Sequence, residues 1–413
     1  MTSPLRQSAA LAPAVREKPA IEGGGAIRSK DRFLVFGAPA IGEAEIEGVV
    51  DSMRRRWIGT GPKVAAFERR FGEYKQGTHA VAVNSATAAM HLALLALGIG
   101  PGDEVITTAM TFCSTANVIV HTGARPVLVD CERDSLNISP DAIEAAITPR
   151  TKAMLIVHFA GRSCDMEAIE AIRRRHGLAL IEDCAHAIET TWRGRHAGTF
   201  GEFGCFSFYA TKNLTTGEGG MVTTADEERA ARIKVLGLHG MSRDAWKRFS
   251  DEGYRHYVVA EAGFKYNMMD IQAAIGLAQF DKLEAMWVRR RQVWRRYDEA
   301  FADLPVFLPK PPDEGTRHAH HLYTPLVDLS RLRCDRDHLL QAMTLEGVGV
   351  GVHYLPVHSH PFYRTFFHSN ETYPNADFVG ERTLSLPLMG DIEDEAVEDV
   401  IAAFRRLLLY YRK

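Results

Sequence analysis

Short apolar runs alternate with longer helical patterns over the first half of the chain. The short runs are rich in β-branched residues and lie at 79–83, 104–107, 126–130, 153–158, 178–183, 204–208 and 220–224. Such runs, separated by helical segments, are typical of parallel strands joined by crossover helices. Two of these helices are predicted at 87–97, where Gly98 marks the end, and at 165–176. The pattern therefore predicts an α/β fold with a wide sheet of seven strands.

The pattern changes after residue 227. A polar insert rich in aromatic residues at 241–257 predicts a loop, and one long helix is predicted at 269–304. A proline-rich joint at 305–312 indicates a domain boundary. The last part predicts strands at 321–329 and 348–354, a helix at 336–346 and an amphipathic helix at 392–408. We therefore expect a flexible leader at 1–32, a large domain at 33–304 and a small α+β domain at 305–413.

Composition and charge exclude several classes of protein. Of the 413 residues, 49 are Lys or Arg and 52 are Asp or Glu, so no basic excess is present for binding nucleic acid. No apolar run reaches the roughly 20 residues that a bilayer crossing needs, and the first 30 residues lack a secretory signal. The six cysteines form no CxxC pair, which favours free thiols. We expect a cytoplasmic protein that binds neither membrane nor nucleic acid.

Asp183 is the first candidate for chemistry, because it ends a buried strand at the edge where α/β sheets bind ligands. A buried carboxylate needs a cationic partner, and a protonated heteroaromatic nitrogen is one such cation. An aspartate at this place also fits a helix N-cap. The position alone leaves both interpretations open.

Two further segments carry candidate groups. Lys212 lies in a polar turn with glycines after the strand at 204–208, where a lysine with a lowered pKa can form an imine. An exposed surface lysine is the alternative. Ser85, Ala86 and Thr87 join a strand to a helix, so their N–H and hydroxyl groups can hold one phosphate, although a plain helix start explains them too. Neither GxGxxG nor GxxxxGK[ST] is present there, so dinucleotide or Walker-type binding has no support.

A phosphate cradle, a carboxylate for a ring nitrogen and an imine-forming lysine are together what pyridoxal phosphate requires. With these segments the chain resembles the fold-type-I pyridoxal phosphate enzymes, and within them the DegT/DnrJ/EryC1/StrS family of nucleotide-sugar aminotransferases. The resemblance covers about residues 33–410 and includes WIGTGP at 57–62, GIGPGDEV at 98–105 and GFKYN at 263–267. DAW at 244–246 and SLPL at 385–388 are similar to the branch that forms UDP-4-amino-4-deoxy-L-arabinose. The implied fold is aspartate aminotransferase-like, with a mixed, mostly parallel seven-stranded sheet and a smaller α+β C-terminal domain.

The resemblance also implies roles for individual residues. Lys212 binds the cofactor and moves protons, and Asp183 pairs with the pyridinium nitrogen. A lysine at 212 favours transamination, because related dehydratases carry histidine there. An asparagine at 267 reaches the cofactor phosphate of the neighbouring subunit, which implies a homodimer with shared active sites. The expected cofactor contacts are Ser85, Ala86, Thr87, Phe112, Asp183, His186, Ser207, Lys212 and Asn267.

The implied reaction moves an amino group from L-glutamate to a keto sugar, expected to be a 4-keto sugar of a nucleoside diphosphate. Candidate substrate contacts are Trp57, Thr60, Arg243, Lys247, Arg248, His353, Tyr354 and His358, although the three cations also fit a solvated loop. One alternative is a keto-inositol aminotransferase of the same family. Another is a non-catalytic regulator, which residues 1–32 disfavour because they are too short for a helix-turn-helix.

Two other clusters receive structural interpretations. His318, His320 and His321 lack an accompanying carboxylate or cysteine cluster, and strand alternation splits them between two faces, so we expect no metal site. They are interpreted as structural or cleft histidines. The arginines at 289–296 lie on the long predicted helix and are expected to pack and form ion pairs.

Overall fold

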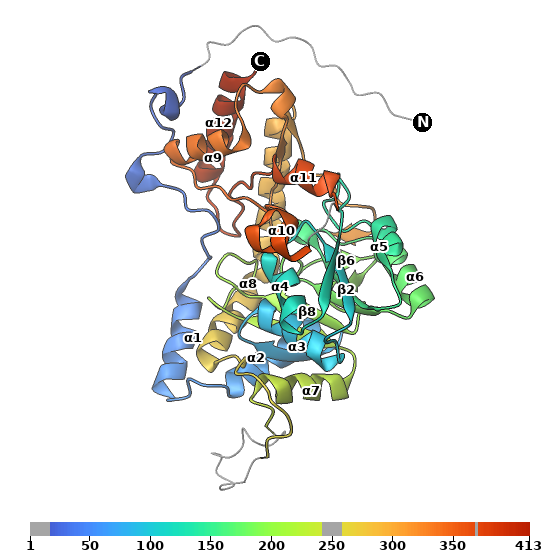
Figure 1. The fold of residues 1–413 in the computed structure, drawn as a ribbon. Coiled ribbons are helices and arrows are strands. Elements are labelled where there is room, and N and C mark those ends of the chain that lie inside the picture. Colours follow the sequence, from blue (N-terminus) through green and yellow to red (C-terminus); the bar gives the residue numbers. More distant parts are fainter. Residues whose placement is uncertain (1–16, 242–257, 368–370) are drawn as a thin grey trace.

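The computed structural model describes residues 17–241, 258–367 and 371–413 (Figure 1). Its helices are α1 (Glu43–Arg54), α2 (Pro62–Tyr74), α3 (Ala86–Ala96), α4 (Cys113–His121), α5 (Pro140–Ala146), α6 (Met166–His176), α7 (Glu227–Gly237), α8 (Asp270–Phe301), α9 (Arg336–Leu345), α10 (Pro361–Phe367), α11 (Pro374–Gly380) and α12 (Asp394–Tyr411). Its strands are β1 (His79–Val83), β2 (Glu104–Thr108), β3 (Arg125–Val129), β4 (Thr151–Val157), β5 (Ala179–Asp183), β6 (Thr191–Trp192), β7 (Arg195–His196), β8 (Phe203–Ser207), β9 (Gly220–Thr224), β10 (Val306–Phe307), β11 (Thr316–Arg317) and β12 (Leu326–Val327).

Seven strands form the central sheet, in the order β1-β9-β8-β5-β4-β2-β3. β9 is antiparallel to both of its neighbours, while the pairs from β8 to β3 are all parallel. The predicted strands are confirmed, each end lying within about two residues of its expected place. The mixed, mostly parallel sheet is therefore the one that the sequence predicts.

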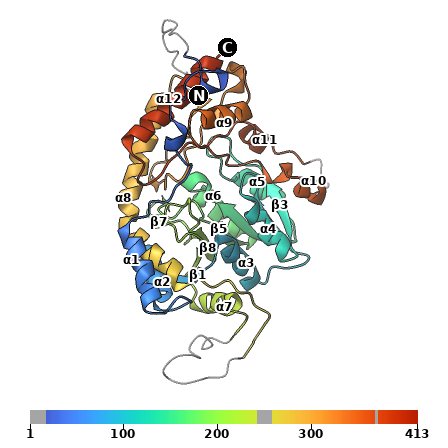
Figure 2. The same cartoon turned by 90° about the vertical axis from the view of Figure 1, so that its left-hand side faces the viewer.

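Helices cover both faces of this sheet (Figure 2). Successive residues of a strand point to opposite faces, so every strand supplies two hydrophobic layers. On β4, Leu155 packs into the core formed with α3, α4 and α7, whereas Ile156 packs into the core formed with α5 and α6. α2 and the first half of α8 complete the second face. Because both faces are buried, the polar groups of the sheet collect at the strand ends.

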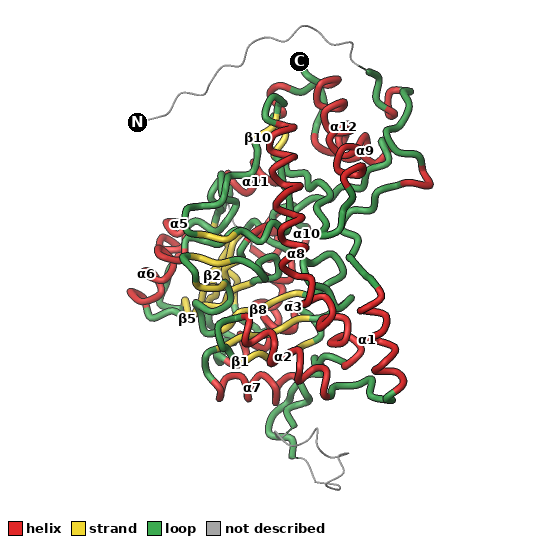
Figure 3. The backbone as a smooth tube through the Cα atoms, turned by 180° about the vertical axis from the view of Figure 1, so that it is seen from behind, coloured by secondary structure: helices red, strands yellow, loops and turns green. Residues whose placement is uncertain are grey.

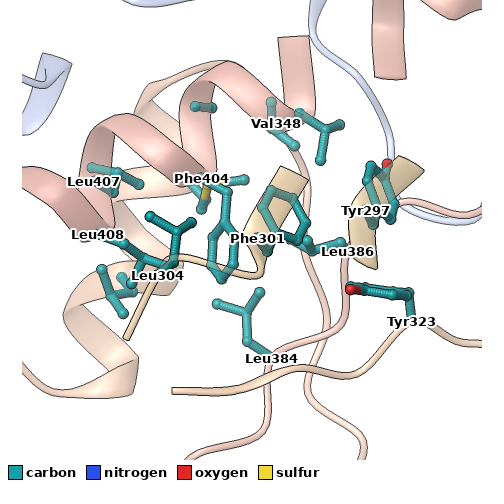
Figure 4. Close-up of a cluster of buried hydrophobic side chains, with 14 of the residues drawn as sticks. Tyr297, Phe301, Leu304, Tyr323, Val348, Leu384, Leu386, Phe404, Leu407 and Leu408 are labelled. Atoms are coloured by element: carbon teal, nitrogen blue, oxygen red, sulfur yellow. The ribbon is translucent and has the colours of Figure 1, made fainter. Parts of the chain in front are cut away.

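The long helix α8 contributes to a second core at the other end of the molecule (Figure 3). Tyr297 and Phe301 from its second half pack there against Tyr323 and Phe404, with Phe301 and Phe404 ring centroids 5.0 Å apart (Figure 4). The helix predicted at 269–304 is confirmed by α8, and those predicted at 336–346 and 392–408 by α9 and α12. The domain limits themselves remain a prediction.

The two strands predicted in the last part are mostly irregular, which corrects that expectation. Only Leu326–Val327 of the first forms a strand, because Pro325 has no N–H group for a sheet ladder. In the second, Val348 and Gly351 form single bridges to Leu34 and Ser385. Gly349, between these bridges, and Gly351 itself weaken a regular strand and allow close backbone contact.

The described part of the predicted leader, residues 17–32, packs against α9 and α12. The N–H groups of Ala20 and Ile27 donate to the buried carboxylate of Glu346 at 2.9 and 3.0 Å. Arg28 forms an ion pair with Asp399 on α12. A buried carboxylate needs such donors, which explains why this part is attached. Residues 1–16 and the loop prediction from 242 to 257 lie outside the described residues. Within the described ranges, no helix is both long and apolar enough to cross a membrane.

Candidate active site

Asp183 lies at the carboxyl end of β5, and its side chain is buried. Its oxygens accept hydrogen bonds from the Ala185 N–H and the Thr115 hydroxyl, both at 3.0 Å. Because Thr115 gives its only proton to Asp183, the Thr111 hydroxyl, 2.9 Å away, must donate to Thr115. Burial raises the pKa of Asp183, whereas the two hydrogen bonds and the charge of Lys212 lower it. A turn, not a helix, follows Asp183, so the N-cap interpretation does not hold.

Lys212 lies in the turn after β8, where its backbone N–H donates to the Tyr209 carbonyl at 2.9 Å. The residue is only partly open to solvent, so the exposed-lysine alternative does not hold. Burial lowers the pKa of Lys212 to about 8, against the opposing attraction of Asp183. A substantial fraction of this amine is therefore neutral near physiological pH, which a nucleophile requires.

The residues predicted to hold a phosphate lie in the turn between β1 and α3. Ser85 is the N-cap of α3, and its hydroxyl accepts from the Ala88 N–H at 3.1 Å. The N–H groups of Ala86 and Thr87 lie in the first helical turn, where no intrahelical acceptor is available. A Cβ on Gly220 would lie 2.4 Å from the Ser85 carbonyl carbon, so only glycine lets β9 approach this turn. Ser207 pairs with Gly220, so the structure brings these cradle residues together.

Aromatic and imidazole rings form one wall of the site. Phe112, at the start of α4, is 56% exposed, and its ring centroid lies 5.9 Å from that of Tyr354. His186 Nδ1 accepts from the Ala160 N–H at 3.1 Å, so a neutral ring carries its proton on Nε2. That Nε2 donates to the Tyr354 hydroxyl at 3.0 Å. Burial, with the charge of Lys212, lowers the pKa of His186 well below its ordinary value, which keeps the ring neutral.

Three residues expected at the cofactor or substrate meet at the end of β1. Trp57 donates its indole N–H to the Thr60 carbonyl at 3.2 Å, and the Asn267 amide donates to the Thr60 hydroxyl at 2.6 Å. Asn267 also forms a bridge with Val83, the last residue of β1. The group therefore lies close in the fold to the start of α3.

The remaining candidates have different positions. His353 is bonded to the Ser385 hydroxyl at 2.7 Å, and burial together with the charge of Lys212 lowers its pKa to about 3. His353 and Tyr354 thus belong to the surroundings of Lys212. His358 is bonded to Asp377 of α11 at 2.8 Å, which joins it to that helix and not to the lysine. Arg243, Lys247 and Arg248 lie outside the described residues.

Residue types suited to a metal gather in one buried cluster of the described chain, formed by His158, Glu182 and Cys184. Hydrogen bonds already occupy it: Glu182 accepts from His158 at 3.0 Å and from the N–H groups of three residues after β7, Gly198, Phe200 and Gly201. His158 Nδ1 accepts from the Cys164 N–H at 3.1 Å. The cluster is explained as a bonded network that holds the end of β5, next to Asp183.

The sequence analysis missed several residues that the site uses. Thr115 is the clearest case: it lies in the first turn of α4, and its hydroxyl contacts that of Thr111, which precedes the helix. His321 was interpreted only as a structural or cleft histidine, yet its ring lies 4.4 Å from that of His186. His318 and His320 stack on each other at 4.8 Å, away from His321, as the alternation predicts. Asn213 carried no sequence signal beyond its place after Lys212.

Residues 39–405 match the DegT/DnrJ/EryC1/StrS aminotransferase family. The chain belongs to this family. The spore coat polysaccharide biosynthesis protein SpsC of Bacillus subtilis is 49% identical over 385 residues, which cover 92% of this chain and 99% of SpsC. These matches confirm the predicted family.

Solved structures agree with this assignment. Spr1654 of Streptococcus pneumoniae, described as a sugar aminotransferase, has a TM-score of 0.85 in its PMP form at 35% identity, covering 91% of this chain and 98% of its own. It is also known in a PLP form. DesI, solved with its TDP-sugar product, has a TM-score of 0.82 at 31% identity, with 93% of this chain and 94% of DesI covered. The chain is therefore a sugar aminotransferase of fold type I that depends on pyridoxal phosphate, and Lys212, Asp183 and the start of α3 fit that cofactor.

Proposed function

We propose that this enzyme transfers an amino group from L-glutamate to the 4-keto group of a sugar linked to a nucleoside diphosphate. The observation that carries the proposal is that Lys212, whose pKa is lowered to about 8, lies close enough to the buried carboxylate of Asp183 for each charge to act on the other. Both groups stand at the carboxyl edge of the sheet, beside a helix N-terminus suited to phosphate. This is the set of groups that amino transfer with pyridoxal phosphate needs.

Bound pyridoxal phosphate supplies an aldehyde carbon and an electron-withdrawing ring, which together allow an amino group to pass between two substrates. In our proposal the Lys212 Nζ binds the cofactor and, once released, takes and returns the proton at the reacting carbon. A base with a pKa near the working pH performs both steps well. Asp183 holds a proton on the ring nitrogen, and Thr115 keeps the Asp183 carboxylate oriented.

Other residues position the groups. Ser85, Ala86, Thr87 and Ser207 bind the phosphate, and Phe112 covers the ring face. The neutral His186 would hold the ring hydroxyl side of the cofactor, and its partner Tyr354 keeps a hydroxyl proton that it can donate. Because Tyr354 accepts from His186, that proton points elsewhere, and we assign it to the cofactor or the sugar.

A nucleotide-linked acceptor is supported by two relatives. SpsC is named for polysaccharide biosynthesis, and DesI was solved with a TDP-sugar product. His353 and Tyr354 are our described candidates for the sugar, while Trp57 and Thr60 are candidates for the nucleotide end. The arabinose-forming branch, amination at C4 and the cytoplasmic location remain part of the proposal.

A homodimer with shared sites is also proposed, because α1 exposes an apolar face. Ile46 and Met53 are seven residues apart on one side of the helix and are 50% and 55% exposed. Trp57 and Ile58, which follow α1 in the chain, are also exposed. Replacing Ile46 and Met53 together by Glu should convert the dimer to monomers in sedimentation velocity, while Leu345→Glu, at an equally exposed apolar residue of α9, should not. If the protein without substitutions sediments as a monomer, the arrangement with shared active sites is contradicted.

The first test is the absorbance spectrum of the PLP-loaded protein before and after L-glutamate. We expect a yellow protein whose visible band is lost with glutamate, and no such turnover in Lys212→Ala. Lys234→Ala is the matched control, since this lysine of α7 forms a surface ion pair with Glu68 of α2. A protein that stays colourless with added PLP, or a Lys212→Ala variant with full turnover, would contradict the assignment.

The second test concerns the acceptor. The glutamate-treated enzyme is mixed with a UDP-linked or TDP-linked 4-keto hexose, a UDP-linked 4-keto pentose or a keto-inositol. Return of the visible band with a nucleotide sugar alone would support the proposal. Its return with keto-inositol alone would assign the enzyme to that alternative acceptor.

A further inference from the structure

A buried hydrogen-bonded chain ends at the residue that follows Lys212. Its first member is Arg290 of α8, which forms an ion pair with the fully buried Glu189. The other Glu189 oxygen accepts from the Asn213 amide at 2.9 Å, and the same amide nitrogen donates to the Ala319 carbonyl at 3.1 Å. The chain therefore connects the long helix to the turn that carries the lysine.

The partners of Asn213 determine the orientation of its amide. A carboxylate and a carbonyl only accept, so the group that faces them is the NH2 and the remaining atom is the oxygen. That oxygen lies 2.9 Å from His321 Nδ1. An amide oxygen only accepts as well, so His321 must carry a hydrogen on Nδ1. A neutral His321 then has its lone pair on Nε2, for which the described residues offer no hydrogen-bond partner.

His321 and His186 face each other with opposite tautomers. Their ring centroids are 4.4 Å apart, and His186 carries its hydrogen on Nε2. Burial lowers the pKa of both rings, and the charge of Lys212 acts on each in the same direction. Protonation of either ring would place a second cation in a space that already holds the lysine. His186 must therefore be neutral, because its Nδ1 accepts a hydrogen bond. For His321, burial beside Lys212 and the lack of a described acceptor for a hydrogen on Nε2 favour the neutral ring with its hydrogen on Nδ1.

We infer that Arg290, Glu189, Asn213 and His321 form a positioning relay for Lys212. The relay anchors the turn that carries Lys212 through Asn213, and it holds His321 neutral against His186. Of Lys212, His186 and His321, only the lysine then changes its charge near neutral pH. The buried ion pair at its far end supplies a fixed acceptor, which a solvated chain would not provide. His321 is a positioning residue in this scheme, because it acts through Asn213 and His186.

The inference rests on Lys212 as the attachment point of the cofactor, but not on the amino donor or the acceptor sugar. Its first test uses protein without PLP, labelled with 15N in histidine, with the His321 signal assigned from its loss in His321→Leu. We expect a neutral ring with hydrogen on Nδ1 between pH 6 and 8. A signal from the Nε2 tautomer, or from a doubly protonated ring in that range, would overturn the relay.

The second test measures the rate at which apoprotein and PLP form the visible band. In this step the Lys212 nitrogen bonds to the aldehyde carbon and the aldehyde oxygen leaves as water, without any oxidant. We expect Asn213→Ala and His321→Leu to slow it at least about tenfold, since small misplacements of reacting groups have large effects. His321→Gln, whose amide N–H can donate to Asn213, should stay within about twofold of the original rate.

His320→Leu is the matched control, because His320 is buried in the same segment but faces Trp294 and has no bond to Asn213. Thermal stability is measured for every variant. Equal rates for His321→Leu and His320→Leu would overturn the relay, as would a Gln variant no faster than the Leu variant. If instead Lys212→Ala forms the visible band normally, the proposed function fails, which is a separate result.

Discussion

Replacing Thr115 by Val tests how the protein holds the carboxylate of Asp183. The substitution keeps the shape of the side chain but removes the hydroxyl that donates to Asp183 at 3.0 Å. Asp183 is buried, and its only other described donor is the Ala185 N–H. A hydrogen bond to a charged group contributes about 1.5–3 kcal/mol, and a buried oxygen left without its donor loses that amount. We therefore expect the free energy of unfolding to fall by about 1.5–3 kcal/mol at pH 7.5.

The loss should depend on pH with a definite sign. Burial already raises the pKa of Asp183 above its unfolded value, and removing a donor raises the pKa further. An acid whose pKa is higher in the folded state is penalised once it ionises, so the deficit is complete above the folded pKa. The deficit shrinks as the pH falls toward the unfolded pKa of about 3.9. We expect a smaller difference from the original protein at pH 5 than at pH 7.5.

Urea unfolding of the apoprotein at the two pH values is the assay. Thr111→Val is the control, because it removes a hydroxyl–hydroxyl bond at 2.9 Å but leaves the Thr115 donor on Asp183. Neutral bonds contribute about 0.5–1.5 kcal/mol, so this variant should lose less and show little pH dependence. If Thr115→Val is no less stable than Thr111→Val, or if its deficit is equal at both pH values, the reasoning is wrong.

Three further outcomes are expected. Gly220→Ala should weaken PLP binding at least about tenfold in a fluorescence titration, because its Cβ would displace the turn at Ser85; Gly25→Ala, with open space around it, is the control and should bind normally. Glu182→Gln should cost about 3 kcal/mol in urea unfolding, since one amide oxygen cannot replace a carboxylate that accepts four hydrogen bonds, and a loss below about 1 kcal/mol would contradict the network. With a Lys212 pKa of about 8, the rate of PLP attachment should rise with pH and level off above about 8; a rise that continues to pH 10 would indicate an ordinary lysine.

Much of the sheet and the main reactive groups can be predicted from local sequence patterns. The predicted strand that ends at Asp183 begins with four apolar residues, 178–181, and its end is marked by the carboxylates of Glu182 and Asp183. Lys212 and Ser85 likewise stand in the turns that follow β8 and β1, where the residue types differ from those of the strands. These signals are local because hydrophobic periodicity follows from which face of an element is buried.

The short strands after α8 could not be predicted in the same way. Residues 321–329 and 348–354 alternate in polarity, but regular pairing also needs a neighbour of matching register. Here Pro325 interrupts one segment, and the other meets only single residues such as Leu34 and Ser385. Whether such a segment pairs as a regular strand depends on which other segments the tertiary structure places beside it.

The sequence by itself determined where the strands of the sheet and the long helix lie along the chain. It also identified the candidate lysine and aspartate, because each of these features follows from the pattern of a few adjacent residues. The tertiary structure alone decided which polar groups meet. Arg290 and Glu189 are 101 residues apart, and His321 and Asn213 are 108 apart, so no spacing rule connects them. Buried polar groups must find partners wherever folding brings them together, and this requirement produced the relay behind Lys212.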